Sequence, residues 1–259
     1  GALVGQTLAA FQVEVQDAQG NRVTTATNQI TITSSVTNTL VGDANENASG
    51  GVATFSALAL DEAGTAYRLT ARSSGLSNGL SEAFDILPGA TTTDITGRSP
   101  ASSVTGQTVT INYDVDVTAP AGGNLTGSVT VSDGAGNSCT GGTTNAGTGS
   151  CAILFPTAGD RSVTATYGLD PNFTGSTSAG LPVSVGKANT TVTITGDQPD
   201  PSGTGAGVLV EFTVTATGSG VAPTGDVTIT VSGGSETCSA PVATGSCTIT
   251  LLAGGDRTL

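Results

Sequence analysis

Residues 149–161 read GSCAILFPTAGDR, and residues 245–257 read GSCTITLLAGGDR. Both copies begin with Gly-Ser-Cys, continue with an apolar run and end with Gly-Asp-Arg. A second cysteine precedes each copy, Cys139 before the first and Cys238 before the second. In each copy we interpret the apolar run as a core strand and Gly-Asp-Arg as a turn. Such repetition indicates tandem modules, so it predicts architecture rather than a ligand.

The repetition continues upstream of these segments. ATTTDITG at 90–97 matches ANTTVTITG at 188–196, and VTINYDVDV at 109–117 matches VLVEFTVTA at 208–216. In the second pair, apolar residues alternate with polar ones along the whole segment. This period of two is typical of a half-buried β-strand, with one face toward a core and the other toward water.

Shorter strand signals follow at similar spacing. They are GSVTV at 127–131, GDVTI at 225–229, RSVTATY at 161–167 and LPVSV at 181–185. Short strands about ten residues apart, separated by turn residues, predict a Greek-key β-sandwich of about 100 residues in each repeat. No stretch shows convincing helical periodicity.

The first 88 residues are a more distant copy of the same module. GQTLAAFQVEVQDAQGN at 5–21 parallels GQTVTINYDVDV at 106–117, and Ile30 and Ile32 share one face of a further short strand. GVATFSALALDEAGTAYRLTA at 51–71 takes the place of the cysteine-led segment. Because this copy has no cysteine, its core must be sufficient alone.

We therefore predict an all-β chain of three tandem sandwiches, at residues 1–88, 89–187 and 188–259. The first lacks the Thr-rich opening strand of the other two, and the third ends without the closing strands. The plain interpretation is that the sequence is part of a longer chain. The alternative is that a neighbouring molecule supplies the missing strands, which would give a filament by strand complementation.

Several of these segments resemble bacterial Ig-like repeats, which occur in tandem arrays in large surface proteins and adhesins. The resemblance lies in TTTDITG (91–97), GQTVTI (106–111), TGSVTV (126–131) and TAGDRSVTATYGLDPNFTGSTS (157–178). The first copy resembles a related Ig-like module through its 16–21 hairpin and its 51–55 strand. The resemblance implies an Ig-like fold throughout and a role as a spacer, and it names no ligand.

Four cysteines allow three pairings, of which the repeat alignment selects Cys139–Cys151 and Cys238–Cys247. Loops of this size should add about 2–3 kcal/mol of stability to each sandwich. The alternative, a zinc site, lacks Cys-x-x-Cys spacing, and the chain has no histidine. Structural disulfides form in oxidising compartments, so the cysteines predict an extracellular protein, secreted or at the cell surface.

Charge and composition exclude several classes of function. With 20 acidic and 7 basic residues, the net charge of −13 disfavours nucleic acid and anionic lipid as partners. No apolar run approaches the ~18 residues of a membrane span, so we expect no membrane insertion in this segment. Alternating apolar residues and only 10% charged residues argue against disorder.

The sequence gives no support for catalysis, and we predict no catalytic, cofactor-binding or metal-ligating residue. Without histidine, Ser-His-Asp and Cys-His machinery is excluded. The single lysine, Lys187, lies at a module junction, and Asp114 and Asp116 lie on the polar face of a strand. A phosphate-binding loop needs a strand followed by a helix, and no helix is expected.

Two weaker possibilities concern ligands on the surface. Calcium is the one candidate cofactor, with Asp197, Asp200 and the acidic loop 42–47 as oxygen donors, although Asp and Asn are also ordinary turn formers. Four Asn-x-Ser/Thr sequons make glycosylation a hypothesis. They begin at Asn47, Asn124, Asn172 and Asn189.

The function predicted is a stalk that serves as a spacer in adhesion or surface-layer assembly. The short junctions at 88–90 and 186–188 should limit bending between modules, and the partners expected are neighbouring repeats or other copies of the chain. One alternative is the strand-complemented filament. A third hypothesis is a ligand-binding adhesin module whose site lies on variable loops such as 133–150, with an unknown surface or matrix ligand.

Overall fold

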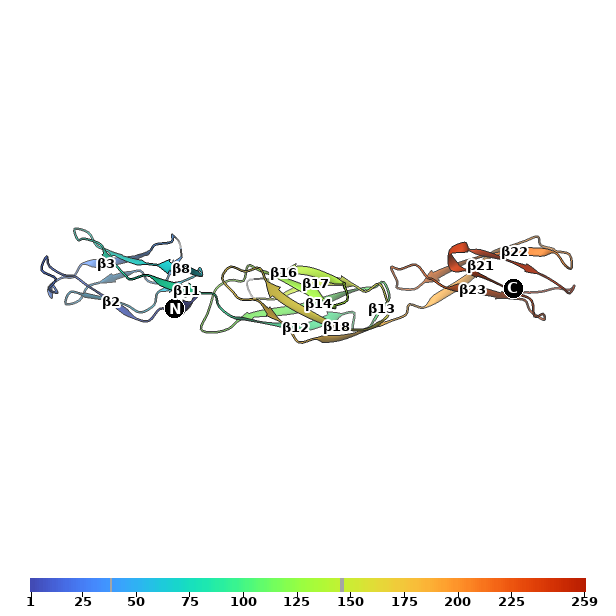
Figure 1. Cartoon of the computed structure of the whole chain (residues 1–259), viewed down its shortest axis with the longest axis horizontal. Helices are drawn as coiled ribbons and strands as arrows, with labels where there is room; N and C mark the ends of the chain where they lie inside the picture. The colour runs from blue at the N-terminus through green and yellow to red at the C-terminus, as the bar shows by residue number, and fades with distance from the viewer. Residues whose placement is uncertain (38, 145–146) are drawn as a thin grey trace. The chain divides into compact units, whose positions relative to one another are not determined.

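The computed structural model describes residues 1–37, 39–144 and 147–259, and its regular structure is almost wholly β (Figure 1). One 3-10 turn, η1 (Val242–Thr244), is the exception among the described residues. Every sheet takes its strands from one of three stretches, residues 2–87, 91–186 or 190–250, which we name the N-terminal, middle and C-terminal stretches. The predicted all-β class of tandem sandwiches is thus confirmed.

The N-terminal stretch forms four small sheets, ordered β1-β11-β8, β10-β9-β3-β5, β2-β6 and β4-β7. Its core holds Ile30, Ile32 and Phe55, and the Phe55 ring stacks on Phe11 across β2 and β6 at 5.3 Å between centroids. The strands are β1 (Ala2–Leu3), β2 (Phe11–Glu14), β3 (Gln29–Ser34), β4 (Leu40–Val41), β5 (Asn45–Asn47), β6 (Val52–Phe55), β7 (Ala59–Leu60), β8 (Gly64–Tyr67), β9 (Leu69–Arg72), β10 (Gly79–Leu80) and β11 (Phe84–Leu87).

The middle stretch forms two sheets, ordered β12-β14-β17 and β13-β20-β18-β15-β16, with β19 paired to β18. The predicted alternation is confirmed in β14, where Val109, Ile111 and Tyr113 are each at most 1% exposed. The strands are β12 (Thr91–Ser99), β13 (Ser103–Val104), β14 (Thr108–Val117), β15 (Ser128–Ser132), β16 (Ser138–Gly142), β17 (Gly149–Leu154), β18 (Gly159–Gly168), β19 (Ser176–Thr177) and β20 (Leu181–Gly186).

The C-terminal stretch repeats part of this pattern with fewer strands, in the orders β21-β22-β25 and β23-β24. Val208, Val210 and Phe212 of β22 are buried, as the alternation predicts. Strand β15 of the middle stretch pairs on both sides, with β16 and β18, whereas its counterpart β23 pairs with β24 alone among the described residues. The strands are β21 (Thr190–Gln198), β22 (Gly207–Ala216), β23 (Asp226–Thr230), β24 (Thr237–Pro241) and β25 (Ser246–Thr250).

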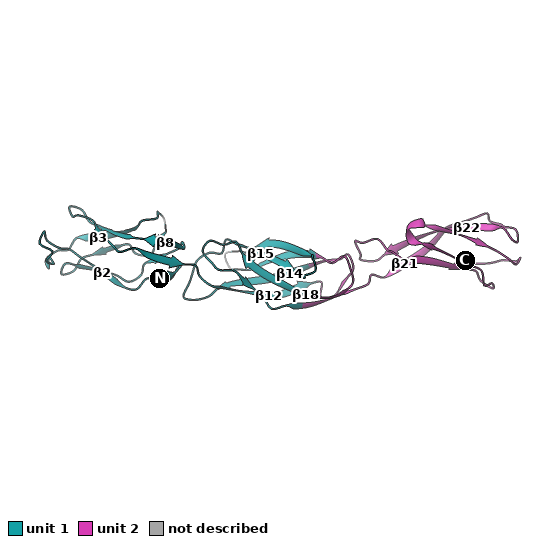
Figure 2. Ribbon diagram, in the orientation of Figure 1, with its two compact units in different colours: residues 1–99, 110–153, 162–181 teal, residues 100–109, 154–161, 182–259 magenta. Residues whose placement is uncertain are grey.

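The chain also divides into two compact units (Figure 2). The first comprises residues 1–99, 110–153 and 162–181, and the second comprises residues 100–109, 154–161 and 182–259. These units do not follow the predicted boundaries after residues 88 and 187. The three-module boundaries therefore stay a prediction, although the sheets fall into three sets.

The Gly-Asp-Arg segment differs between its two copies. In the first copy the turn prediction is wrong, because Gly159 to Arg161 already belong to the extended strand β18. The chain bends earlier, at Thr157, where Arg161 Nη2 donates to the carbonyl and the hydroxyl of Thr157 at 2.9 and 2.6 Å. In the second copy, residues 255–257 belong to no strand, and Arg257 Nη1 donates to Ser232 O at 2.9 Å.

Candidate functional site

The two disulfides each join strands from different sheets. Cys139 on β16 bonds Cys151 on β17, and Cys238 on β24 bonds Cys247 on β25, each with a Cα–Cα distance of 5.9 Å. These are the pairs that the repeat alignment selects, and no cysteine is free. Each bond therefore connects the two layers of a sandwich at their edge, where β16 and β24 end their sheets.

A buried tyrosine fills the space beside the first disulfide. Tyr113 OH donates to Gly142 O at 3.0 Å, and burial raises the pKa of this phenol. Two glycines make room for the ring, because a Cβ added at Gly149 would lie 2.4 Å from a ring carbon, and one at Gly141 would lie 2.3 Å from the hydroxyl. The register places PLACEHOLDER

Asp170 is the centre of a hydrogen-bond cluster at the other end of the middle stretch. Its Oδ2 accepts from Tyr167 OH and from two backbone amides, Thr126 N at 2.7 Å and Gly127 N at 3.0 Å. Its Oδ1 accepts from the backbone N of Asn172 at 2.8 Å. The carboxylate thus satisfies several donors of the loop before β15 and of the loop after β18.

Two pKa values record this cluster. Burial alone would raise the pKa of Asp170, but the hydrogen bonds from Tyr167, Thr126 and Asn172 outweigh it, so the pKa lies below its ordinary value. Burial first, and then the hydrogen bond to Asp170, raise the pKa of Tyr167 to about 12. The pattern Tyr-x-x-Asp-x-Asn was visible within the quoted 157–178 segment. Nothing in the strand periodicity assigned these residues a role.

Asn172 extends the cluster to the loop before β8, within the first compact unit. Its side-chain Oδ1 accepts from Ala63 N at 2.9 Å, and its Nδ2 donates to Asp61 O at 3.3 Å. Asn172 also begins one of the four sequons, so its amide is engaged in the same contact that a glycan would replace.

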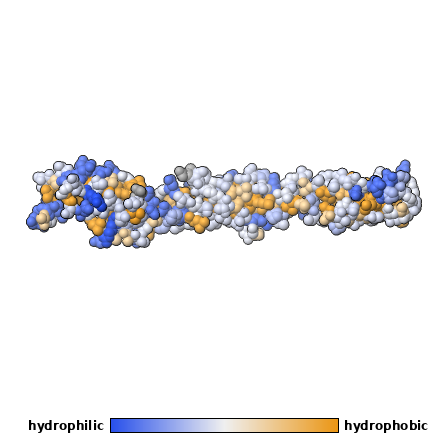
Figure 3. Space-filling view, turned by 90° about the horizontal axis from the view of Figure 1, so that it is seen from above, coloured by the Kyte–Doolittle hydropathy of each residue, from blue (hydrophilic) through white to orange (hydrophobic). Residues whose placement is uncertain are grey.

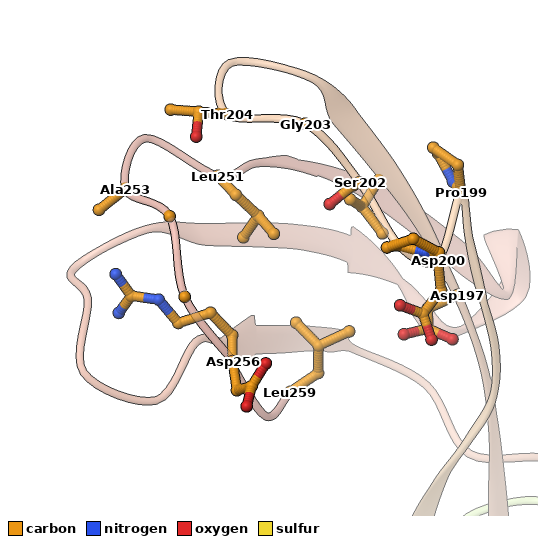
Figure 4. A pocket seen from close by; sticks show the side chains of 15 residues that line it. Asp197, Pro199, Asp200, Ser202, Gly203, Thr204, Leu251, Ala253, Asp256 and Leu259 are labelled. Atoms are coloured by element: carbon orange, nitrogen blue, oxygen red, sulfur yellow. The ribbon is translucent and has the colours of Figure 1, made fainter.

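The calcium candidates lie in two separate places. In the 42–47 loop, Asp43 accepts from the backbone N of Asn45, and the Asn45 side chain accepts from Thr31, so both side chains hold turn and strand geometry. Asp197 and Asp200 line a cleft of about 380 Å³ (Figure 4). Among the described residues, no group of three or more His, Cys, Asp or Glu is placed to hold a metal ion. Calcium binding stays a prediction.

That cleft lies at a position of known contents in the middle stretch. By the repeat alignment, its wall residues Gly203 and Thr204 correspond to the region of β13, where Ser103 pairs with Val185 of β20. Figure 4 shows Leu251 and Leu259 facing the interior of the cleft, with Ser202 and Thr204 on its rim. The cleft thus has the apolar floor and polar rim of a strand-sized groove.

The other residues considered for chemistry lie apart from one another. Asp114 Oδ1 accepts from Val115 N at 3.1 Å, whereas Asp116 and Lys187 are exposed. In the loop 133–150, Asp133 accepts from the side chain of Asn137 at 2.6 Å, and residues 145 and 146 lie outside the described residues. The geometry brings none of these side chains together with the disulfides.

Apolar side chains at the surface are dispersed. Leu80, Leu169 and Leu252 are 65%, 91% and 70% exposed, and they come from separate parts of the chain. On the face shown in Figure 3, apolar residues gather in several patches separated by polar ones. The described part of the chain holds no helix with the length and apolarity needed to cross a membrane.

The comparisons with known proteins give one family. Residues 95–186 match the bacterial Ig-like domain family, group 3. No curated protein matches the chain. Among solved structures, invasin, a bacterial integrin-binding protein, is 16% identical with a TM-score of 0.49, over 97% of this chain and 58% of that one. The D0-D1 domain of intimin is 18% identical with a TM-score of 0.28, over 71% of this chain and 94% of that one.

The adhesin FdeC of Escherichia coli is 15% identical with a TM-score of 0.31, over 97% of this chain and 85% of that one. Identities and TM-scores this low transfer no function, and the chain spans 58% of the length of the invasin structure. The family match is different, because it covers the strands β13 to β20 and the Cys139–Cys151 disulfide. Through residues 95–186, the chain therefore belongs to the bacterial Ig-like domain family, group 3.

Proposed function

We propose that the chain is a structural spacer, a stalk segment of a secreted or cell-surface bacterial protein that acts in adhesion or surface-layer assembly. It is built of three Ig-like modules at 1–88, 89–187 and 188–259 and has no catalytic role. Support comes from the family match, from the tandem sandwiches and from disulfides that suit an oxidising exterior.

The observation that carries the proposal is the packing of the first linker, residues 88–90. Gly89 N donates to Asn172 O at 2.9 Å, and Gly89 O accepts from Thr174 N at 2.8 Å. A Cβ added at Gly89 would lie 2.6 Å from the Ala121 Cβ and 3.0 Å from the Phe173 ring. The linker is therefore hydrogen-bonded and enclosed along its backbone, which is the property that a spacer needs and a flexible tether lacks.

Small-angle X-ray scattering of the chain tests the spacer proposal. An extended particle whose scattering fits one arrangement of modules is expected. A compact particle, or a broad mixture of arrangements, would contradict the proposal.

Replacing Asn172 with alanine should loosen the first junction. The variant loses both side-chain hydrogen bonds to residues 61 and 63, which together contribute about 1–2 kcal/mol. We expect faster proteolysis at 88–90 and a broader scattering distribution, with the Cys139–Cys151 bond intact. The matched control is Asn124→Ala, because Asn124 is exposed and is also a sequon asparagine. Equal proteolysis rates in the two variants would count against the clasp.

A second candidate function, the strand-complemented filament, is favoured by the open edge of β23. Strand β15 has β18 on that side, whereas β23 has no partner there among the described residues. Consistent with this, Val192 is 49% exposed, although its counterpart Thr93 is only 4% exposed. Sedimentation at rising concentration separates the candidates. Concentration-dependent polymers that a synthetic peptide of residues 162–186 disperses would favour the filament, and a monomer at all concentrations would exclude it.

A further inference from the structure

Three equivalent glycine turns recur along the chain, one in each stretch. Gly5, Gly106 and Gly205 all have positive φ angles, of 67°, 77° and 82°. Each donates its backbone N–H to the carbonyl of the equivalent residue in its own stretch: Leu60 at 2.7 Å, Phe155 at 2.7 Å and Leu251 at 2.8 Å. The turns are thus the same element, folded and anchored in the same way three times.

The first two turns also match in their side-chain support. Gln6 Oε1 accepts from Leu3 N at 2.8 Å, and Gln107 Oε1 accepts from Val104 N at 3.2 Å. The third turn has Ala206 at this position, and it keeps the backbone bond from Ala206 N to Gly203 O at 3.0 Å. The backbone geometry of the turn is therefore independent of the glutamine.

The first two turns are each in contact with a glycine-rich loop of the next stretch. Within the first compact unit, Gly122 N donates to Val4 O at 3.0 Å. Within the second unit, Gly220 N donates to Gly106 O at 3.1 Å. Gly122 lies between β14 and β15, and Gly220 lies between the equivalent strands β22 and β23. The same turn therefore receives the same loop twice.

These contacts are too close for any side chain. A Cβ added at Gly5 would lie 2.2 Å from Gly122 O, and one added at Gly106 would lie 2.6 Å from Val221 N. At Gly205, by contrast, a Cβ would meet no atom within 4 Å. Burial follows the same order, since Gly106 is buried and Gly205 is exposed. The third turn has the docking geometry without an occupant among the described residues.

We propose that the turn at Gly205 is a docking surface for the glycine-rich β14–β15-type loop of a further Ig-like repeat. The occupant would place a backbone N–H against the carbonyl beside Gly205, as Gly122 and Gly220 do at the two earlier turns. The inference rests on the spacer proposal and deepens it by naming the partner of this surface. Its own failure is separable, because a chain without this contact still gives the extended scattering expected of a spacer.

The first experiment measures amide hydrogen exchange in the full chain by NMR. Gly5→Ala should speed exchange of the Gly122 amide about tenfold, and Gly106→Ala should do the same for the Gly220 amide, because each loses its acceptor. Gly205→Ala is the matched control, since it introduces the same positive-φ strain with no atom displaced. It should leave both amides unchanged. If Gly205→Ala has the same effect as the other two, the turns are not docking devices and the proposal fails.

The second experiment supplies the occupant, as a chain in which residues 162–259 follow Arg257. This arrangement adds the closing strands of the third repeat and one more copy of the loop 217–225. The added copy of the Gly220 amide should be protected as the original is, and Gly205→Ala should now remove that protection about tenfold. Exchange as fast as in an unfolded peptide, with Gly205 intact, would overturn the proposal.

A third measurement decides the question if the extended chain does not fold. The Gly106→Ala chain, whose loop 217–225 is released, is added at millimolar concentration to the isotope-labelled wild-type chain. The amide signals of residues 203–207 should shift, and they should not shift in labelled Gly205→Ala. Absence of any shift in the wild-type chain would contradict docking at this turn.

Discussion

Replacing Cys139 and Cys151 together with alanine should lower the free energy of unfolding of the middle stretch by about 2–3 kcal/mol. The bond closes a loop with a sequence separation of 12 residues, and its loss releases the unfolded chain from that constraint. Because the two cysteines lie on strands of different sheets, their removal also frees β16 at the edge of its sheet. Differential scanning calorimetry measures the change.

The matched control for this pair is Ser138→Ala with Ser150→Ala. These serines precede the two cysteines, are exposed and should change stability by no more than about 0.5 kcal/mol. The same alanine replacement at Cys238 and Cys247 should cost slightly less, since the separation is 9 residues. If the cysteine variant unfolds at the control's temperature, the disulfide contributes nothing to stability.

Asp170→Ala should destabilise the middle stretch by about 1–3 kcal/mol. It leaves the backbone amides of Thr126 and Gly127 and the hydroxyl of Tyr167 without their acceptor. The best-matched comparison is Asp116→Ala, because Asp116 is exposed on the same stretch. Thermal unfolding of both variants measures the difference. Equal midpoints would show that the cluster is not a source of stability.

The same cluster makes stability depend on pH at both extremes. The pKa of Asp170 is lower in the folded chain, so its contribution is present above the ordinary pKa, about 3.9, and is lost as the pH falls through the folded value. The pKa of Tyr167 is raised to about 12, so its contribution is present below about 10 and is lost as the pH rises through 12. Tyr167→Phe should remove the alkaline loss and keep most of the acid one.

Strand positions were the part of the fold that sequence periodicity could predict. In β14 and β22 the buried faces are those of the alternating residues, because a period of two places every second side chain in the core. Asp170 could not be assigned in this way. It acts on the backbone amides of Thr126 and Gly127, distant in sequence, and such contacts leave no periodic pattern.

Identical letters were also insufficient where their surroundings differ. Gly-Asp-Arg opens a strand in one copy because Arg161 donates to the carbonyl and hydroxyl of Thr157. The other copy has Ala253 in place of that threonine, and its Arg257 donates to Ser232 instead. The glycine turns were missed for a related reason. A positive φ and a neighbour at contact distance are properties of the folded chain, and a glycine in the sequence is compatible with many other roles.

The cross-sheet position of the Cys139–Cys151 bond has a mechanical consequence. When tension is applied to the two ends of the chain, the covalent path runs through the sulfur atoms and bypasses the residues between the cysteines. At about 3.5 Å for each extended residue, this hides roughly 40 Å of contour length from the applied force. The closed loop between the cysteines can lose its hydrogen bonds without lengthening the chain. Under load, each such module therefore stays shorter than its residue number would allow.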